Sequence, residues 1–346
     1  MQMLLSEKMR EKMINIGIIG IGRFGINYLK TFNQIGNATV RWICAANKTT
    51  LNRVSHQLNL PSSIKTTTNN KDILGDKKVD AVAIVTPGST HYKLAKEALM
   101  SNKHVIVEKP LAFSSYHVKE LIKISNKKRK KLMVGHLHRF NPCFNKLKED
   151  IKQGIFGRIN YIHSVHAGNG PVRSDMNAMW DFFPHTISIL LNLLEEMPIE
   201  VSSNGKCFLN KDIEDVVTID MVFPNKVFST TMVSWLYPIK KMDMTVIGEN
   251  LYATFDDYGK NGKLKYYKNR PPLAEKDTTM KESGYYLPRF KDGKPLTGQL
   301  QHFLDCINFN KEPITNGFEG LKVVSVLEAA QKSLRSNGAR IKVKIP

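Results

Sequence analysis

The sequence predicts an α/β domain followed by an α+β domain whose sheet is mainly antiparallel. A glycine-rich turn joins the first strand to the first helix, and strands then alternate with helices up to residue 134. After residue 200, strand-like runs follow one another with few helices between them. A chain of 346 residues is too long for one ordinary core. We therefore expect domains at residues 13–135 and 136–346, with residues 1–12 as an N-terminal extension.

The first domain begins with a strand at residues 15–19, a helix at 23–35 and a strand at 40–46, which together have the length of a βαβ unit. The unbroken apolar run at residues 79–85 is typical of a parallel strand that is covered on both faces. The remaining predicted elements are helices at about 90–101 and 115–130 and strands at 104–107 and 132–134.

In the second domain, predicted strands mostly follow one another without intervening helices. Strand-like runs with polar breaks and many β-branched residues indicate an antiparallel sheet. Its predicted strands are 159–165, 200–208, 216–223, 227–235, 242–247 and 340–344, and its predicted helices are 143–152, 181–194, 299–308 and 318–336. Residues 259–295, rich in Lys, Gly, Pro and Tyr, are the best candidate for a mobile loop over the site.

The turn Gly20-Ile21-Gly22-Arg23-Phe24-Gly25 ends a strand and starts a helix, as a dinucleotide-binding turn must. The first glycine permits the tight turn, the second lets the backbone approach a pyrophosphate, and the third lets the helix pack on the sheet. The helix N-terminus, including Arg23 and Phe24, would face the phosphates. The first domain is therefore predicted to be a Rossmann domain that binds NAD or NADP.

The choice between NAD and NADP depends on the end of the second strand. NAD enzymes usually have Asp or Glu about 20 residues after the turn, where it binds the ribose hydroxyls. Here the strand is followed by Asn47-Lys48. Asn47 can bind a hydroxyl, and Lys48 could neutralise a 2′-phosphate or be an ordinary solvated lysine. We expect NAD or NADP, with a slight preference for NADP.

The chain has a net charge of +20 at pH 7. The densest basic run, residues 127–131, ends a predicted helix, where the helix dipole favours cations. It contains no aromatic residues that could stack on bases, so we expect no nucleic-acid partner. The sequence has no apolar run of bilayer length, no signal peptide pattern and no paired cysteines. We expect a cytoplasmic protein without a membrane partner.

Further motifs lie where strands of the first domain end and in a helix of the second. Glu108-Lys109-Pro110 follows the strand at 104–107, and Trp180-Asp181-Phe182-Phe183-Pro184-His185 comes about seventy residues later. Together with the glycine turn, Thr86-Pro87 and His91, these motifs resemble the Gfo/Idh/MocA family of oxidoreductases over nearly the whole chain. The resemblance implies an open antiparallel sheet in the second domain, which often forms homodimer or homotetramer contacts. His138-Arg139-Phe140-Asn141-Pro142 and the Trp180–His185 motif resemble the subgroup of sugar and polysaccharide biosynthesis, although Thr186 replaces a common Asp.

The residues themselves suggest how a hydroxyl could be oxidised. His185 is a natural acid or base near neutral pH, and Asp181, four residues earlier on a helix, can orient it or bind a hydroxyl. Lys109 can donate to the reacting oxygen. The resemblance gives these three residues catalytic positions, places Glu108 near the nicotinamide ribose and implies a cis peptide before Pro110. Thr86, Pro87 and His91 would then contact the cofactor, and Arg139 and Trp180 the substrate.

Each of these residues also has a simpler interpretation. Asp181 could be a helix N-cap, His185 a core histidine and Lys109 a surface lysine. The pairs His136/His138 and His163/His166 lack an acid or cysteine that would complete a metal site, so we expect no metal.

The leading hypothesis is an NAD(P)-dependent dehydrogenase or reductase for a nucleotide sugar, amino sugar or polyol. The alternative is a non-catalytic dinucleotide-binding sensor on the same scaffold. Retention of Lys109, Asp181 and His185 argues against the sensor.

Overall fold

The structure is a computed structural model that describes residues 12–259, 263–268 and 284–344. Residues 1–11 of the predicted extension and residues 260–262 and 269–283 of the predicted loop lie outside the described part. Contacts divide the chain into two compact units: residues 1–135 with 296–320, and residues 136–295 with 321–346. This grouping adds residues 296–320 to the first unit, whereas the sequence assigned everything after residue 135 to the second domain.

The sheet of the first unit has the strand order β3-β2-β1-β4-β5-β6, and all pairs are parallel. This is the order of the dinucleotide-binding doubly wound fold, in which ligands bind beyond the carboxyl ends of the strands. The strands are β1 (Ile14–Ile19), β2 (Ala38–Cys44), β3 (Lys65–Thr67), β4 (Ala81–Ile84), β5 (His104–Val107) and β6 (Leu132–Val134). All four residues of β4 are buried, which explains the unbroken apolar run in the sequence.

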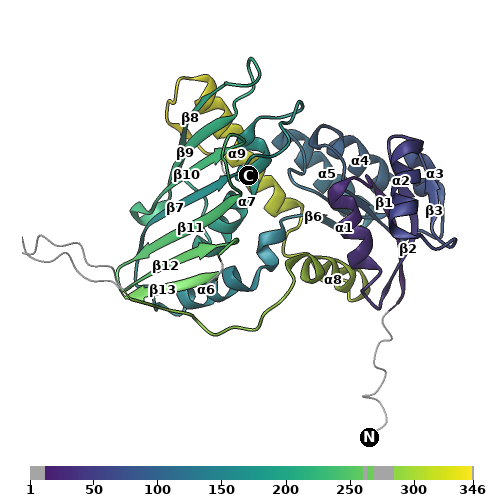
Figure 1. The fold of residues 1–346 in the computed structure, drawn as a ribbon, viewed down its shortest axis with the longest axis horizontal. Helices are drawn as coiled ribbons and strands as arrows, with labels where there is room; N and C mark the ends of the chain where they lie inside the picture. Colours follow the sequence, from purple (N-terminus) through teal and green to yellow (C-terminus); the bar gives the residue numbers. More distant parts are fainter. Residues whose placement is uncertain (1–11, 260–262, 269–283, 345–346) are drawn as a thin grey trace, which may run out of the picture. The chain divides into compact units, whose positions relative to one another are not determined.

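Helices flank this sheet (Figure 1). They are α1 (Arg23–Phe32), α2 (Lys48–Leu58), α3 (Asn70–Gly75), η1 (Gly88–Thr90), α4 (His91–Met100), α5 (Ser115–Lys128) and α8 (Pro295–Asn308). The sequence analysis missed α2, α3 and β3. In α2 only Leu51 and Val54 are buried, so the helix presents almost no apolar face that periodicity could reveal.

The second unit is built on a mixed sheet whose described strands have the order β14-β13-β12-β11-β7-β10-β9-β8-β15. Only β7 and β10 are parallel neighbours; the other pairs are antiparallel. The strands are β7 (Ile159–Ala167), β8 (Glu200–Lys206), β9 (Val216–Val222), β10 (Phe228–Ser234), β11 (Lys241–Gly248), β12 (Leu251–Asp256), β13 (Leu264–Lys268), β14 (Tyr285–Tyr286) and β15 (Ile341–Lys342). The sequence analysis missed β12, and β13 and β14 fall within the predicted loop.

Helices of the second unit cover one face of this sheet. α7 packs on β7, β9 and β10, while burial alternates along β11, so that every second side chain faces the less covered side. The remaining helices are η2 (Leu137–Phe140), α6 (Pro142–Lys152), α7 (Ala178–Leu194), η3 (Pro224–Lys226) and α9 (Gly317–Arg335), which starts in the first unit. The predicted fold class, a Rossmann domain plus an α+β domain with an open, mainly antiparallel sheet, is confirmed.

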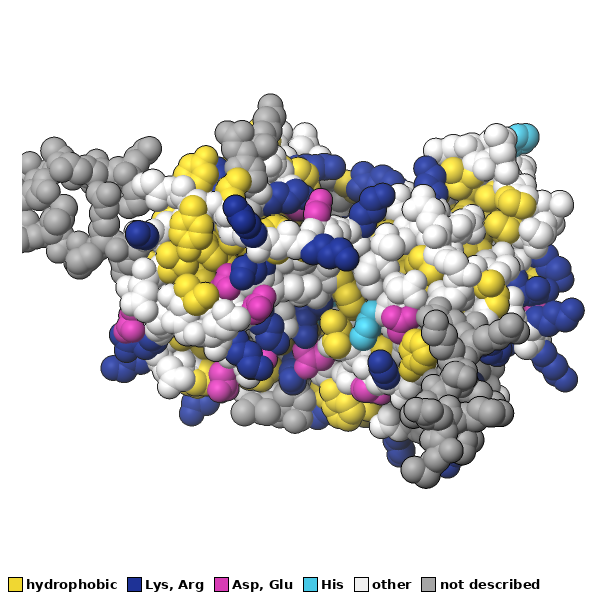
Figure 2. All heavy atoms as spheres, turned by 90° about the horizontal axis from the view of Figure 1, so that it is seen from below, with side chains coloured by type: hydrophobic (Ala, Val, Ile, Leu, Met, Phe, Trp, Pro, Cys, Tyr) yellow, Lys and Arg dark blue, Asp and Glu magenta, His cyan; other side chains and the backbone are white. Residues whose placement is uncertain are grey.

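Basic side chains outnumber acidic ones on the face of the molecule that Figure 2 shows. The Lys and Arg side chains are scattered across that face. In the part of the chain that is described, no helix has the length and apolar character needed to cross a membrane.

Candidate active site

Two glycines of the turn after β1 are required by the fold itself. Gly20 has φ +97°, a left-handed conformation, and a Cβ there would lie 2.3 Å from the carbonyl oxygen of Val85. A Cβ on Gly25 would lie 2.0 Å from the carbonyl oxygen of Gly20. Because both contacts are with backbone, neither position tolerates a side chain without moving the main chain.

Gly22 differs from these two glycines, since a Cβ there would meet no atom within 4 Å. It is the N-cap of α1, it offers no capping side chain, and no acidic residue occupies the first turn of the helix. The first N–H groups of an α-helix have no partner within the helix, and they carry the positive end of the helix dipole. The residues present fit a dinucleotide pyrophosphate, and Gly22 and the exposed Arg23 and Phe24 would hold it.

Asn47 and Lys48 lie where β2 gives way to α2, and both are exposed. The Oδ1 atom of Asn47 accepts a hydrogen bond from the backbone N–H of Thr50 (2.8 Å) and so caps the helix. The amide Nδ2 of Asn47 is then oriented as a donor at the carboxyl end of β2. This arrangement is compatible with a ribose hydroxyl, and neither Asn47 nor Lys48 carries a negative charge that would repel a phosphate.

His91 ties together the loops that follow β4 and β5. Its ring is buried, with Nδ1 2.7 Å from the carbonyl oxygen of Pro110 and Nε2 2.9 Å from that of Thr86. Each ring nitrogen thus lies within hydrogen-bonding distance of a backbone carbonyl. His91 therefore positions these loops through their backbone. The peptide between Lys109 and Pro110 is cis, as the resemblance implied.

Glu108 is the last member of a buried chain of hydrogen bonds within the first unit. Tyr28 donates its hydroxyl to Oε1 of Glu108 (2.7 Å), and Gln299 donates Nε2 to the Tyr28 oxygen (2.9 Å). Burial raises the pKa of Glu108, and burial together with the Glu108 carboxyl raises that of Tyr28. Gly135 leaves room for the carboxyl, because a Cβ there would lie 2.8 Å from Oε1. Nothing in the sequence pointed to Tyr28 or Gln299 as partners.

In the second unit, α7 carries Asp181 and His185. The N-cap of α7 is Asn177, whose Oδ1 accepts from the backbone N–H of Trp180 (3.1 Å). Asp181 lies in the first turn of the helix and is not its cap, so the capping interpretation is wrong. Pro184, inside the helix, cannot donate a backbone hydrogen bond to the carbonyl of Trp180.

Asp181 is buried between two donors of its own unit. Trp235, directly after β10, donates its indole N–H to Oδ2 of Asp181 (3.2 Å). The Nε atom of Arg173 lies 3.6 Å from the same oxygen. The indole of Trp235 and the guanidinium of Arg173 thus both face Oδ2 of Asp181 and orient this side chain. Sequence reasoning missed Trp235, because its separation of 54 residues from Asp181 gives no local signal.

His185 lies among other aromatic rings. Its ring centroid is 5.1 Å from that of His138 on η2 and 5.4 Å from that of His166 on β7. His166 also stacks on Phe182 at 4.4 Å. The structure thus brings together one member of each predicted histidine pair around His185. Among the described side chains, no group of three or more His, Cys, Asp or Glu has the arrangement of a metal site.

The structure gives the remaining predicted site residues other contacts or only partial burial. The indole N–H of Trp180 binds Oε1 of Gln331 on α9 (2.9 Å), and its side chain is buried in packing. Arg139 on η2 is half-buried, as is Lys109 after β5. Thr86 shares a hydrogen bond with Thr90 through their hydroxyls (2.6 Å) and is followed by Pro87, which precedes η1.

Comparison with known proteins identifies the family. The model of the oxidoreductase family with an NAD-binding Rossmann fold matches residues 14–136, and that of the GFO/IDH/MocA C-terminal domain matches residues 144–253. The chain belongs to the Gfo/Idh/MocA oxidoreductase family. The predicted resemblance and the nicotinamide cofactor are thereby confirmed, and this family member is an NAD-binding oxidoreductase.

Relatives of this family member match along most of their length. The chain is 25% identical to the uncharacterized oxidoreductase YrbE of Bacillus subtilis, with 93% of the chain and 95% of the relative covered. It is 22% identical to the myo-inositol 2-dehydrogenase of Thermotoga maritima, with 93% and 96% covered. The structure of the UDP-N-acetylglucosamine 3-dehydrogenase from Acidithiobacillus ferrooxidans aligns with a TM-score of 0.79, 21% identity and coverage of 94% and 98%. That likeness shows the shared fold.

Proposed function

We propose that this chain oxidises a secondary hydroxyl of a sugar-like molecule, or reduces the corresponding ketone, with NAD or NADP as the redox partner. The carrying observation is the pair on α7: a buried, doubly oriented carboxylate at Asp181 and, one helical turn later, the imidazole of His185. Polar groups of this kind suit a hydroxylated substrate. The named activities of the inositol and UDP-N-acetylglucosamine dehydrogenases support the same class.

The bound nicotinamide would supply or accept the hydride, and the protein supplies the proton transfer. His185 would take the hydroxyl proton on a ring nitrogen during oxidation and return it during reduction. The carboxylate of Asp181 would favour the protonated imidazole electrostatically, or receive a substrate hydroxyl, while Trp235 and Arg173 keep its orientation. Lys109 is proposed to donate a hydrogen bond to the reacting oxygen, and Glu108 to lie near the nicotinamide ribose.

The remaining assignments belong to the same proposal. Gly20, Gly22, Arg23, Phe24 and Gly25 would receive the pyrophosphate. Asn47 would bind the adenosine ribose, and Lys48 supports a slight preference for NADP. Thr86, Pro87 and His91 would form the adjoining wall. Arg139 and Trp180 would bind the substrate.

Two properties of the whole protein complete the proposal. We expect a cytoplasmic homodimer or homotetramer, assembled through the less covered face of the second sheet. Light scattering of the purified chain tests the assembly.

The proposal is tested by a substrate screen with the purified chain. NAD⁺ and NADP⁺ are each mixed with UDP-N-acetylglucosamine, other nucleotide sugars, amino sugars and inositols, and the reduced-nicotinamide absorbance is followed. We expect reduction with at least one of them. Tight dinucleotide binding without reduction by any of these substrates, and without oxidation of NADH or NADPH by their keto forms, would favour the sensor.

A further inference from the structure

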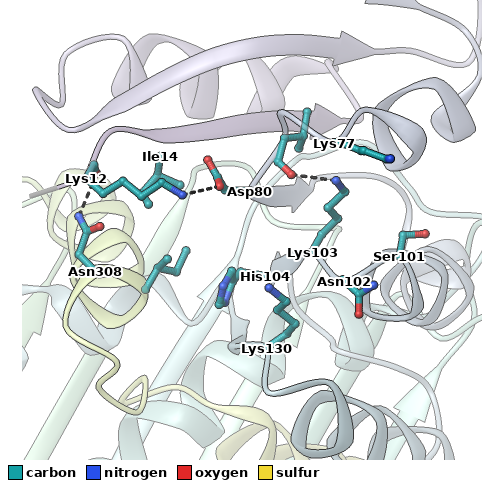
Figure 3. A pocket seen from close by; sticks show the side chains of 12 residues that line it. Lys12, Ile14, Lys77, Asp80, Ser101, Asn102, Lys103, His104, Lys130 and Asn308 are labelled. Carbon is teal, nitrogen blue, oxygen red and sulfur yellow. Dashed lines mark hydrogen bonds and ion pairs between the residues drawn. The ribbon is translucent and has the colours of Figure 1, made fainter.

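A cavity of about 540 Å³ lies at the amino-terminal edge of the parallel sheet (Figure 3). Ile14 at the start of β1 is in its wall, whereas Ile19 at the other end of β1 leads into the glycine turn. A strand rises about 3.3 Å per residue, so the cavity is roughly 17 Å from the turn. A ligand in this cavity would not compete with the dinucleotide for space.

The most buried cation in the wall of the cavity is Lys103, which is only 5% exposed. Its Nζ atom donates to the carbonyl oxygens of Asp76 (2.7 Å) and Val79 (2.8 Å). An ammonium has three N–H groups, and no other described residue accepts the third. Among the described residues, no carboxylate forms an ion pair with Lys103. Burial lowers the pKa of Lys103 even though the Asp76 and Asp80 carboxylates oppose this effect, so an anion in the cavity would further stabilise the charged form.

The rim of the cavity adds positive charge. Lys77 and Lys130 line it, and neither forms an ion pair with any residue in the described ranges. The single carboxylate of the wall, Asp80, is already held by Lys12 (Nζ to Oδ1, 2.9 Å) and by the backbone N–H of Asn15 (2.9 Å). Its charge is therefore offset by Lys12, and the three other lysines leave an excess of positive charge.

His104 contributes a neutral donor. Its Nδ1 atom accepts from the backbone N–H of Lys131 (3.0 Å), which assigns the proton of the neutral ring to Nε2. Burial, with the nearby charges of Lys130 and Lys131, lowers the pKa of His104 to about 4. At neutral pH the ring therefore provides an N–H donor without adding a charge.

We propose that this cavity is a second ligand site that binds a phosphate group, separate from the dinucleotide site. Lysine ammonium groups serve as point charges for phosphate, and the volume is within the range of small-molecule sites. An adjoining hollow of about 300 Å³ shares Lys130 and includes Arg129 and Lys131, so a second charged group can be accommodated. Part of the basic run at residues 127–131 thereby gains a role beyond that of a solvated helix end. The phosphate can be inorganic or belong to a phosphorylated small molecule.

The test is calorimetric titration of the full chain at constant ionic strength, with NAD present at saturation so that the glycine turn is occupied. Inorganic phosphate, pyrophosphate and glucose 6-phosphate are titrated separately. We expect one site for at least one of them, and the order of affinities distinguishes the inorganic source from the phosphorylated one. Removing two charged hydrogen-bond donors in Lys77→Gln/Lys130→Gln should weaken binding by about tenfold or more.

The matched control is Lys119→Gln/Lys123→Gln, which removes the same charge from exposed positions of α5 outside both hollows. This variant should bind within about twofold of the unaltered chain, because distant exposed charges are screened by salt. Absence of binding by all three compounds would overturn the proposal. An equal loss in both double variants would also overturn it, since it would show attraction to the basic surface as a whole. Both rim lysines are exposed or half-buried, so folding of the variant is not at risk.

Discussion

The glycine turn of the first unit and the α7 site of the second are built in opposite ways. The turn is made by six consecutive residues, and backbone geometry alone requires glycine at positions 20 and 25. The α7 site combines Asp181 and His185 with side chains from η2, β7 and β10. A local site can be identified from its sequence, whereas a site assembled from distant strands can be identified only in part.

The same difference predicts how each site responds to substitution. In the turn, a side chain either meets the backbone, at Gly20 and Gly25, or enters open space, at Gly22. Around α7, the contacts are between side chains, so single groups can be removed while the backbone stays in place. Substitutions at the turn should therefore lower either the stability of the fold or the affinity for the cofactor. Substitutions around α7 should lower the rate of the reaction.

The largest effect is expected for His185→Asn. Loss of a general acid or base slows turnover by about 10²–10⁴-fold. The variant should bind NAD as the unaltered chain does, because His185 belongs to the second unit and the turn to the first. Steady-state kinetics and cofactor titration measure the two quantities separately. If His185→Asn also lost NAD affinity, the reaction site and the cofactor site would not be separate as described.

Gly22→Leu and Gly25→Ala form a matched pair within the turn. The leucine enters the space assigned to the pyrophosphate, so NAD affinity should fall by roughly a hundredfold while the melting temperature changes little. The smaller alanine meets the carbonyl of Gly20 and should lower the free energy of unfolding by about 1–3 kcal/mol. Calorimetry and thermal melting of both variants check this. A destabilised Gly22→Leu that still binds NAD would reverse the assignment.

The buried hydrogen-bond chain of Glu108 predicts that the stability of the first unit depends on pH. Because its pKa is raised in the folded state, the native protein binds more protons than the unfolded chain between the ordinary value of 4.5 and the raised one. Stability should therefore fall as the pH rises through that window, and Glu108→Gln should lose this fall. Urea unfolding at a series of pH values measures it. An unchanged pH dependence in the variant would show that Glu108 is not the group responsible.

The smallest effect is expected for Trp235→Phe, which keeps the aromatic ring and removes the indole N–H. A hydrogen bond to a carboxylate contributes about 1.5–3 kcal/mol, and Arg173 remains nearby, so kcat should fall roughly tenfold. A positioning role predicts a change in kcat and in its pH profile with little change in cofactor affinity. A variant that loses only stability, with kcat and pH profile unchanged, would make Trp235 a packing residue.

The sequence predicted the elements that have a strong pattern and missed those without one. β4 and the glycine turn were predicted because burial on both faces and backbone sterics leave a clear signature. α2 was missed, since it buries only two residues, and Trp235 was missed because tertiary structure alone brings it to Asp181. The sequence did not distinguish Asp181 from Asn177 as the N-cap of α7, because both residue types cap helices; in the structure Asn177 is the cap.

The central claim is that this chain transfers hydride between nicotinamide and a hydroxyl-bearing carbon of a sugar-like substrate. Its most direct test is a single turnover with a substrate from the screen that carries deuterium on the reacting carbon. Mass spectrometry of the recovered dinucleotide should then find deuterium in the reduced nicotinamide, and none with His185→Asn on the same timescale. A dinucleotide that binds tightly yet acquires no deuterium from any substrate of the panel would contradict the account.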